Sequence, residues 1–159
     1  MIGVFVFGFF LERIIGHLRV AIIYIVSAAG GAWCAFLVAQ WPWFSPDYSP
    51  SSIMQLHIGA SGAVFGLLGV LLVPSRRLDR NYSGVLGFLA VNALYMVFNT
   101  NISWQGHIGG LIVGFVLGLP ALLAPPRFRT ATTILSAAAV VAAIAISLIF
   151  MPTPQVVIH

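Results

Sequence analysis

Long apolar blocks separated by short polar turns make up most of the chain, and apolar and polar positions do not alternate along it. A helix rises about 1.5 Å per residue, so about 20 apolar residues cross a hydrocarbon core of about 30 Å. Blocks of this kind occupy residues 20–41, 56–74, 82–98, 106–124 and 130–151. The pattern therefore predicts an all-α fold, a polytopic membrane helix bundle.

The block at the start of the chain is shorter than the others. Residues 1–10 are apolar, but a segment of this length reaches across about half of a bilayer. It lacks the basic beginning and the small-residue cleavage site of a signal peptide. We interpret it as the second half of a spanning helix whose first half is missing from the sequence.

Composition narrows the classes of function. The chain is 60% hydrophobic and 6% charged, whereas globular domains carry roughly 25% charged residues. No basic cluster is interleaved with aromatic residues on a polar face, so we expect a lipid bilayer around the protein and no nucleic acid partner. The sequence has no Cys/His ligand set and no phosphate-cradling loop, so we expect neither a metal nor another cofactor.

The placement of positive charge predicts the orientation in the membrane. The turns at 42–55 and 99–105 and the C-terminal tail contain no Lys or Arg. All seven arginines lie in the other connections between the apolar blocks. These connections would lie together on the membrane face opposite to the uncharged turns, and by the positive-inside rule this face is predicted to be cytoplasmic. The seven cationic residues are Arg13, Arg19, Arg76, Arg77, Arg80, Arg127 and Arg129.

Two polar residues stand near the beginnings of two apolar blocks that descend from the predicted outer face. Ser61 lies in the glycine-rich stretch 59–66, and His107 lies in the stretch 106–110. Both residues are therefore expected at a similar depth. A reactive group at membrane depth is a functional-site hypothesis by default. A serine hydroxyl needs an adjacent base to become a nucleophile, and imidazole is the usual one.

The residues around this pair suit a close approach of the two helices. Gly62 and Gly66 on one helix, and Gly110 and Gly114 on the other, each form a small-xxx-small face. Phe65 follows Ser61 by one turn on the same face and is expected to pack on the imidazole.

No acid is placed to orient His107. Glu12 and Asp79 belong to the arginine-bearing face, and Asp47 lies in the outer loop. A serine–histidine dyad is therefore predicted rather than a triad. For Glu12, with Arg13 and Arg19, we expect an interfacial anchor and a local ion pair.

These motifs resemble those of the rhomboid family of intramembrane serine proteases. The stretch 59–63 with Phe65 and Gly66 is similar to the family's nucleophile helix, and 107–110 with Gly114 is similar to its histidine helix. Residues 8–31 are similar to the passage between the family's second and third helices through Leu11, Glu12, Arg13, Gly16, Arg19, Tyr24 and Ser27.

The resemblance implies a function and roles for residues. Ser61 would be the nucleophile and His107 the general base, and the backbone N–H of Ser61 would contribute to an oxyanion hole. Gly59 would support the oxyanion hole or the helix packing. Substrates would be transmembrane segments of other proteins, entering laterally, and the loop 42–55 would be a mobile cap. Residues 1–124 would form a partial rhomboid-like core, and 130–151 would be an extra C-terminal transmembrane helix.

One departure from the family pattern leaves alternatives open. The family's His-x-x-x-Asn motif, which supplies further oxyanion donors, would lie before Met1, so we expect the sequence to be truncated. A catalytically inactive relative that binds transmembrane helices is the alternative. A small channel or transporter is less well supported, because there is no intramembrane charge relay and no inverted repeat. The compact build with few loops suggests a bacterial plasma membrane.

Overall fold

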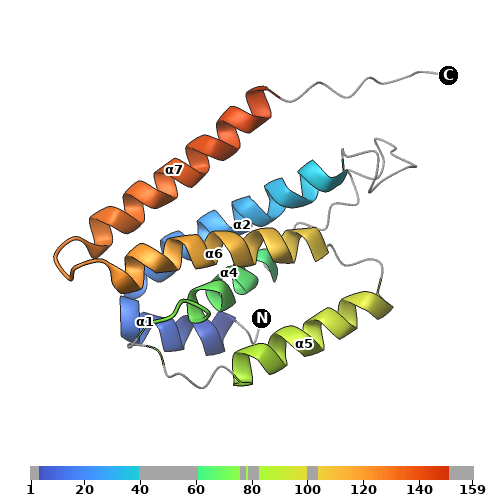
Figure 1. The fold of residues 1–159 in the computed structure, drawn as a ribbon, viewed down its shortest axis with the longest axis horizontal. Helices are drawn as coiled ribbons and strands as arrows, with labels where there is room; N and C mark the ends of the chain where they lie inside the picture. The colour runs from blue at the N-terminus through green and yellow to red at the C-terminus, as the bar shows by residue number, and fades with distance from the viewer. Residues whose placement is uncertain (1–3, 40–60, 76–77, 79–82, 100–103, 151–159) are drawn as a thin grey trace.

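The computed structural model describes residues 4–39, 61–75, 78, 83–99 and 104–150. Within these residues all regular structure is helical, which confirms the predicted all-α class. The elements, seen in Figure 1, are η1 (Val4–Gly8), α1 (Phe9–Ile15), α2 (His17–Ala39), α4 (Ser61–Leu71), α5 (Ser83–Phe98), α6 (Trp104–Leu123) and α7 (Arg129–Ile149).

Several of these helices match the dimensions of a bilayer. Among the described residues, His17–Val38, Trp104–Leu123 and Arg129–Ile149 are long and apolar enough to cross a membrane, while α4 and α5 are shorter apolar helices. Helices suit lipid because each one satisfies its backbone hydrogen bonds internally. The chain is thus an integral membrane protein built as a helix bundle.

The centre of the bundle consists of α2, α4 and α6, which pack side by side (Figure 1). Helices α4 and α6 run parallel, because successive glycines of α4 face successive positions of α6. A Cβ atom built on Gly62 would lie 3.2 Å from the carbonyl oxygen of Gly106, and one built on Gly118 would lie 3.1 Å from the Cα of Val70. Side chains at these glycines would therefore separate the two backbones.

Helix α2 joins this pair in the antiparallel direction through small residues of its own. A Cβ atom on Gly31 would lie 2.6 Å from the carbonyl oxygen of Gly106, and one on Gly66 would collide with the side chain of Ser27. The sequence predicted the glycine faces of α4 and α6 but did not assign α2 a share in this packing.

The turn between α1 and α2 depends on one glycine. Gly16 has a φ of 85°, a left-handed conformation that residues with a Cβ rarely adopt. Its N–H donates a 2.9 Å hydrogen bond to the carbonyl oxygen of Glu12 and ends α1. The turn folds η1 and α1 back against α2 and α4.

Helices α5 and α7 lie outside the central three. Phe88 of α5 makes an edge-to-face contact with Phe7, at 5.1 Å between ring centroids. Helix α7 is held to α2 by hydrogen bonds at both of its ends. The Nε and Nη2 atoms of Arg19 donate to Thr130 Oγ1 at 3.2 and 3.0 Å, and Trp33 Nε1 donates to Ser147 Oγ at 2.7 Å.

The sequence predicted a local ion pair of Glu12 with Arg13 and Arg19. This prediction is wrong, because the described side chains at the α1–α2 turn make other contacts. The carboxylate of Glu12 instead accepts a 2.8 Å hydrogen bond from Nδ1 of His17. Arg13 lies over the ring of Phe9, and Arg19 binds Thr130. Because Gly16 reverses the chain, it brings His17 rather than an arginine to the carboxylate.

Candidate active site

Ser61 and His107 lie at corresponding positions of two packed parallel helices. Ser61 is the first described residue of α4 and is exposed, whereas His107 lies in the first described turn of α6 and is 7% exposed. Their sequence neighbours Gly62 and Gly106 face each other across the α4–α6 contact. The packing register thus brings the hydroxyl-bearing and imidazole-bearing positions to the same level of the bundle.

An aromatic contact fixes the imidazole from the side of α4. The rings of Phe65 and His107 have centroids 4.3 Å apart and planes inclined by 47°. Phe65 is 6% exposed, and the Nδ1 atom of His107 is fully buried. The ring contact that the sequence predicts is therefore present, one helical turn after Ser61.

The glycines below this level determine how close the helices come. A Cβ atom on Gly110 would collide with the carbonyl oxygen of Gly62, and one on Gly114 would collide with that of Gly66. In membranes, helix association depends on van der Waals packing, so small residues at the contact allow the backbones to approach. The four glycines lie at the α4–α6 contact; their importance for catalysis stays a prediction.

Some of the predicted residues fall outside the described part of the chain. These are Gly59, which was assigned a supporting role, and the predicted cap loop, 42–55. Glu12 is described and lies at the α1–α2 turn, where it binds His17, so it does not orient His107. Among the described residues no group of three or more His, Cys, Asp or Glu side chains could hold a metal ion.

The sequence did not identify the contribution of α2 to the wall of this site. Gly31 packs on the Gly106 carbonyl, and Ser27 packs on Gly66 with its Oγ atom fully buried. The spacing Ser27-x-x-x-Gly31 is itself a small-xxx-small pattern. It is the sequence feature that could have revealed this contact.

The site places a serine, Ser61, and a base, His107, at corresponding positions of two membrane helices. A serine hydroxyl is activated when a neighbouring base accepts its proton, and imidazole can accept and return a proton near neutral pH. Phe65 restricts the ring that would do so. The fold and the site define a polytopic α-helical membrane protein with a candidate serine–histidine pair.

Comparison with known proteins gives the family. The model of the Rhomboid domain matches residues 1–124, so the chain belongs to the rhomboid family. The match leaves α7 outside, at the C-terminal side of the domain.

Individual relatives agree with this assignment. The chain is 31% identical over 135 residues to RHOMBOID-like protein 6, mitochondrial, of Arabidopsis thaliana, covering 79% of this chain and 38% of that protein. It is 32% identical over 122 residues to Rhomboid protease GluP of Bacillus subtilis, covering 71% and 21%. With Rhomboid protease AarA of Providencia stuartii it shares 26% identity over 149 residues, covering 82% and 52%.

The alignments cover only part of each of these relatives. The chain spans less than half the length of RHOMBOID-like protein 6, mitochondrial, and of RHOMBOID-like protein 5 of Arabidopsis thaliana, at 38% and 39%. No solved structure matches the chain. Since the relatives come from bacteria and from a plant, the bacterial plasma membrane stays a prediction.

Proposed function

We propose that this chain carries the catalytic centre of an intramembrane serine protease, with Ser61 as nucleophile and His107 as general base. The observation that carries the proposal is the contact between Phe65 and His107, because it brings the imidazole of α6 against the helix that begins with Ser61. Relatives named rhomboid proteases support the same reaction.

The proposed reaction proceeds in two halves. His107 accepts the proton of Ser61 as its Oγ attacks the carbonyl carbon of a peptide bond in a transmembrane substrate. The protonated imidazole then donates to the leaving amine as the C–N bond breaks, which leaves an acyl-serine. A water molecule, deprotonated by His107, hydrolyses this ester and restores the serine. The backbone N–H of Ser61 would stabilise the oxyanion.

The decisive experiment uses the full chain reconstituted in liposomes with a model transmembrane substrate. Ser61→Ala and His107→Ala should each abolish cleavage, because a dyad fails when either member is removed. Ser136→Ala in α7 and His159→Ala in the C-terminal tail are matched controls and should cleave normally. Cleavage that persists in both dyad variants would overturn the proposal.

A second experiment distinguishes a chain whose serine is not activated from an active chain that does not cleave the model substrate. A fluorophosphonate probe modifies activated serines without needing a peptide substrate. Labelling of the unaltered chain that disappears in Ser61→Ala would support the activated serine. A folded chain that neither cleaves nor labels would favour the alternative, a relative that binds transmembrane helices without cutting them.

A further inference from the structure

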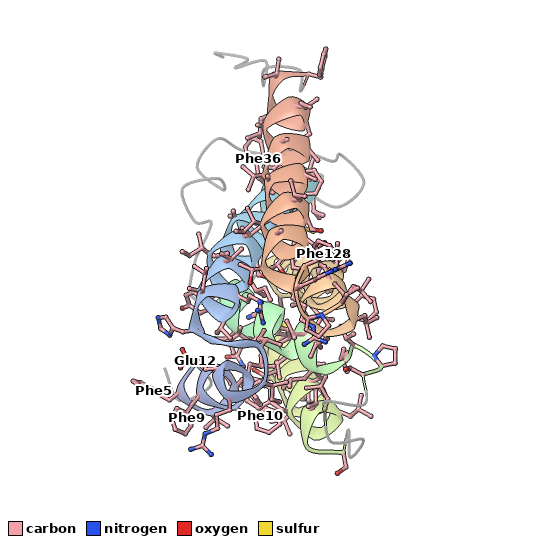
Figure 2. All side chains as sticks on the ribbon, turned by 90° about the vertical axis from the view of Figure 1, so that its left-hand side faces the viewer. Phe5, Phe9, Phe10, Glu12, Phe36 and Phe128 are labelled. Atoms are coloured by element: carbon pink, nitrogen blue, oxygen red, sulfur yellow. The ribbon has the colours of Figure 1, made fainter. Side chains whose placement is uncertain are left out.

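Helix α7 lies outside the residues that match the Rhomboid domain, 1–124, but it packs on the central helices α2 and α6. Its first half is held by packing, since Thr133 is fully buried and Ala137 is 6% exposed. Figure 1 shows that its second half stands apart from α6. In Figure 2, α7 extends from Phe128 past Phe36 of α2. A hydrogen bond to α2 attaches this second half to the bundle.

This hydrogen bond has a defined direction. Trp33 Nε1 donates to Ser147 Oγ at 2.7 Å, and that hydroxyl donates to the carbonyl oxygen of Ile144 at 2.7 Å. An indole can only donate, and a serine hydroxyl has one hydrogen, so the hydroxyl serves as acceptor and donor at once. Both side chains are half-buried. The bond therefore fixes the position of Trp33 relative to α7.

The same turn of α2 packs on α6 around the candidate base. A Cβ atom built on Gly31 would lie 2.6 Å from the carbonyl oxygen of Gly106, the residue before the base. One built on Gly109, two residues after the base, would collide with the Cβ atom of Cys34. Residues before and after Trp33 in the sequence thus contact residues before and after the candidate base.

Contacts of this kind transmit small movements between helices. Gly31 and Gly106 approach each other without a side chain between them, and densely packed interiors pass a displacement on because they are hardly compressible. On α4, the ring of Phe65 lies 4.3 Å from that of His107, measured between centroids. The position of the imidazole therefore depends on α4 through Phe65, and on α2 through the backbone beside the base.

We propose that Trp33 and Ser147 are positioning residues of the active site, through which α7 holds α2 against the helix of His107. The inference rests on the proposed function, since it concerns the same base. Both residues act through the packing of α2 rather than on the substrate. Without their bond α2 shifts relative to α6, and the imidazole leaves the geometry in which it accepts the proton of Ser61. A small misplacement of a catalytic group is enough to slow a reaction.

The beginning of α7 provides a matched comparison. There the Nε and Nη2 atoms of Arg19 donate to Thr130 Oγ1 at 3.2 and 3.0 Å, and these bonds also join α2 to α7. Arg19 lies about 18 Å along α2 from Gly31, at the helical rise per residue. If α7 were only a general attachment, losing either contact would have the same effect on catalysis. A positioning role predicts that only the contact of Trp33 with Ser147 affects His107.

The test compares Ser147→Ala with Thr130→Val in the full chain, reconstituted in liposomes with a model transmembrane substrate. Ser147→Ala should lower kcat roughly three- to tenfold with little change in KM, which is the effect of a membrane hydrogen bond that acts on the transition state. Thr130→Val should lower the free energy of unfolding but leave kcat unchanged. Ser147→Thr keeps the hydroxyl and should restore the rate, and Trp33→Phe should behave like Ser147→Ala.

A second measurement follows His107 without catalysis. Nuclear magnetic resonance of a chain with isotope-labelled histidine detects the imidazole rings, and His107→Ala identifies the resonances of His107 by their loss. Ser147→Ala should shift these resonances, whereas Thr130→Val should leave them in place. This measurement needs no cleavage, so the positioning role and the proposed protease can fail separately.

The outcomes decide the proposal in either direction. Equal losses of kcat in Ser147→Ala and Thr130→Val would overturn it, because α7 would then be only a general attachment. An unchanged kcat in Ser147→Ala, a rate that Ser147→Thr does not restore, or His107 resonances that Ser147→Ala leaves in place would each do the same. If circular dichroism shows that Ser147→Ala does not fold, Trp33→Phe gives the same comparison, since it removes the donor instead of the acceptor.

Discussion

The ring of Phe65 lies against the imidazole of His107, with 4.3 Å between centroids and 47° between planes. One residue belongs to α4 and the other to α6, and the two are far apart in the sequence. Their contact holds the candidate base against the helix that carries the candidate nucleophile. It makes Phe65 a positioning residue in the proposed reaction.

Replacing Phe65 with leucine should slow cleavage while the chain stays folded. Leucine keeps an apolar side chain but loses the ring contact, which is worth about 0.5–1.5 kcal/mol in aromatic pairs. We therefore expect kcat to fall roughly two- to tenfold, with a smaller change in KM. Tyrosine at this position should restore most of the rate.

The control for this substitution is Phe88→Leu, which removes the aromatic contact of α5 with Phe7 rather than one in the site. Cleavage kinetics in liposomes measure both variants. A full rate for Phe65→Leu, or an equal loss in the control, would contradict the positioning role.

A methyl group at Gly114 should destabilise the bundle. The added Cβ would collide with the carbonyl oxygen of Gly66, so α4 and α6 must move apart. Overpacking of this kind costs about 1–3 kcal/mol. We expect Gly114→Ala to lower the free energy of unfolding in detergent micelles by about this amount, and to reduce cleavage.

Gly87→Ala on α5 is the matched control, because nothing lies within 4 Å of the added methyl group. Denaturation of both variants, followed by circular dichroism, measures the difference. If the two substitutions have the same small effect, the glycine contact does not limit the approach of the helices.

The hydrogen bond between Trp33 and Ser147 should couple α2 to α7. A double-mutant cycle with Trp33→Phe and Ser147→Ala isolates their interaction in the free energy of unfolding. Interhelical hydrogen bonds in membranes average about 0.6 kcal/mol and reach about 1.7, so we expect a coupling in this range. Ser136→Ala replaces Ser147→Ala in a control cycle and should give a coupling near zero.

Residues at opposite ends of the helices should be accessible from opposite sides of the membrane. We expect Arg127→Cys to react with a membrane-impermeant maleimide only after cells are opened, and Asn99→Cys to react in intact cells. The reason is the retention of positively charged loops on the cytoplasmic side. Cys34 is first changed to Ser, because it is a free cysteine. Labelling of Arg127→Cys in intact cells would reverse the predicted orientation.

The sequence by itself determined the helical class and the position of the helices. In lipid each helix must satisfy its own backbone hydrogen bonds, so the information for each span lies within its own apolar block. The pairing of Ser61 with His107 could be predicted from motifs for a related reason. Glycines beside each residue indicate a close helix contact, and equal distance from one membrane face indicates equal depth.

Which face of α2 packs on α4 and α6 was decided by the tertiary structure. A helix in lipid is apolar on all sides, so the hydrophobic pattern does not indicate the face that packs on a neighbour. The contacts of Ser27 and Gly31 with α4 and α6 therefore emerged only from packing. The bond between Glu12 and His17 depends on the left-handed turn at Gly16, which brings the two side chains together.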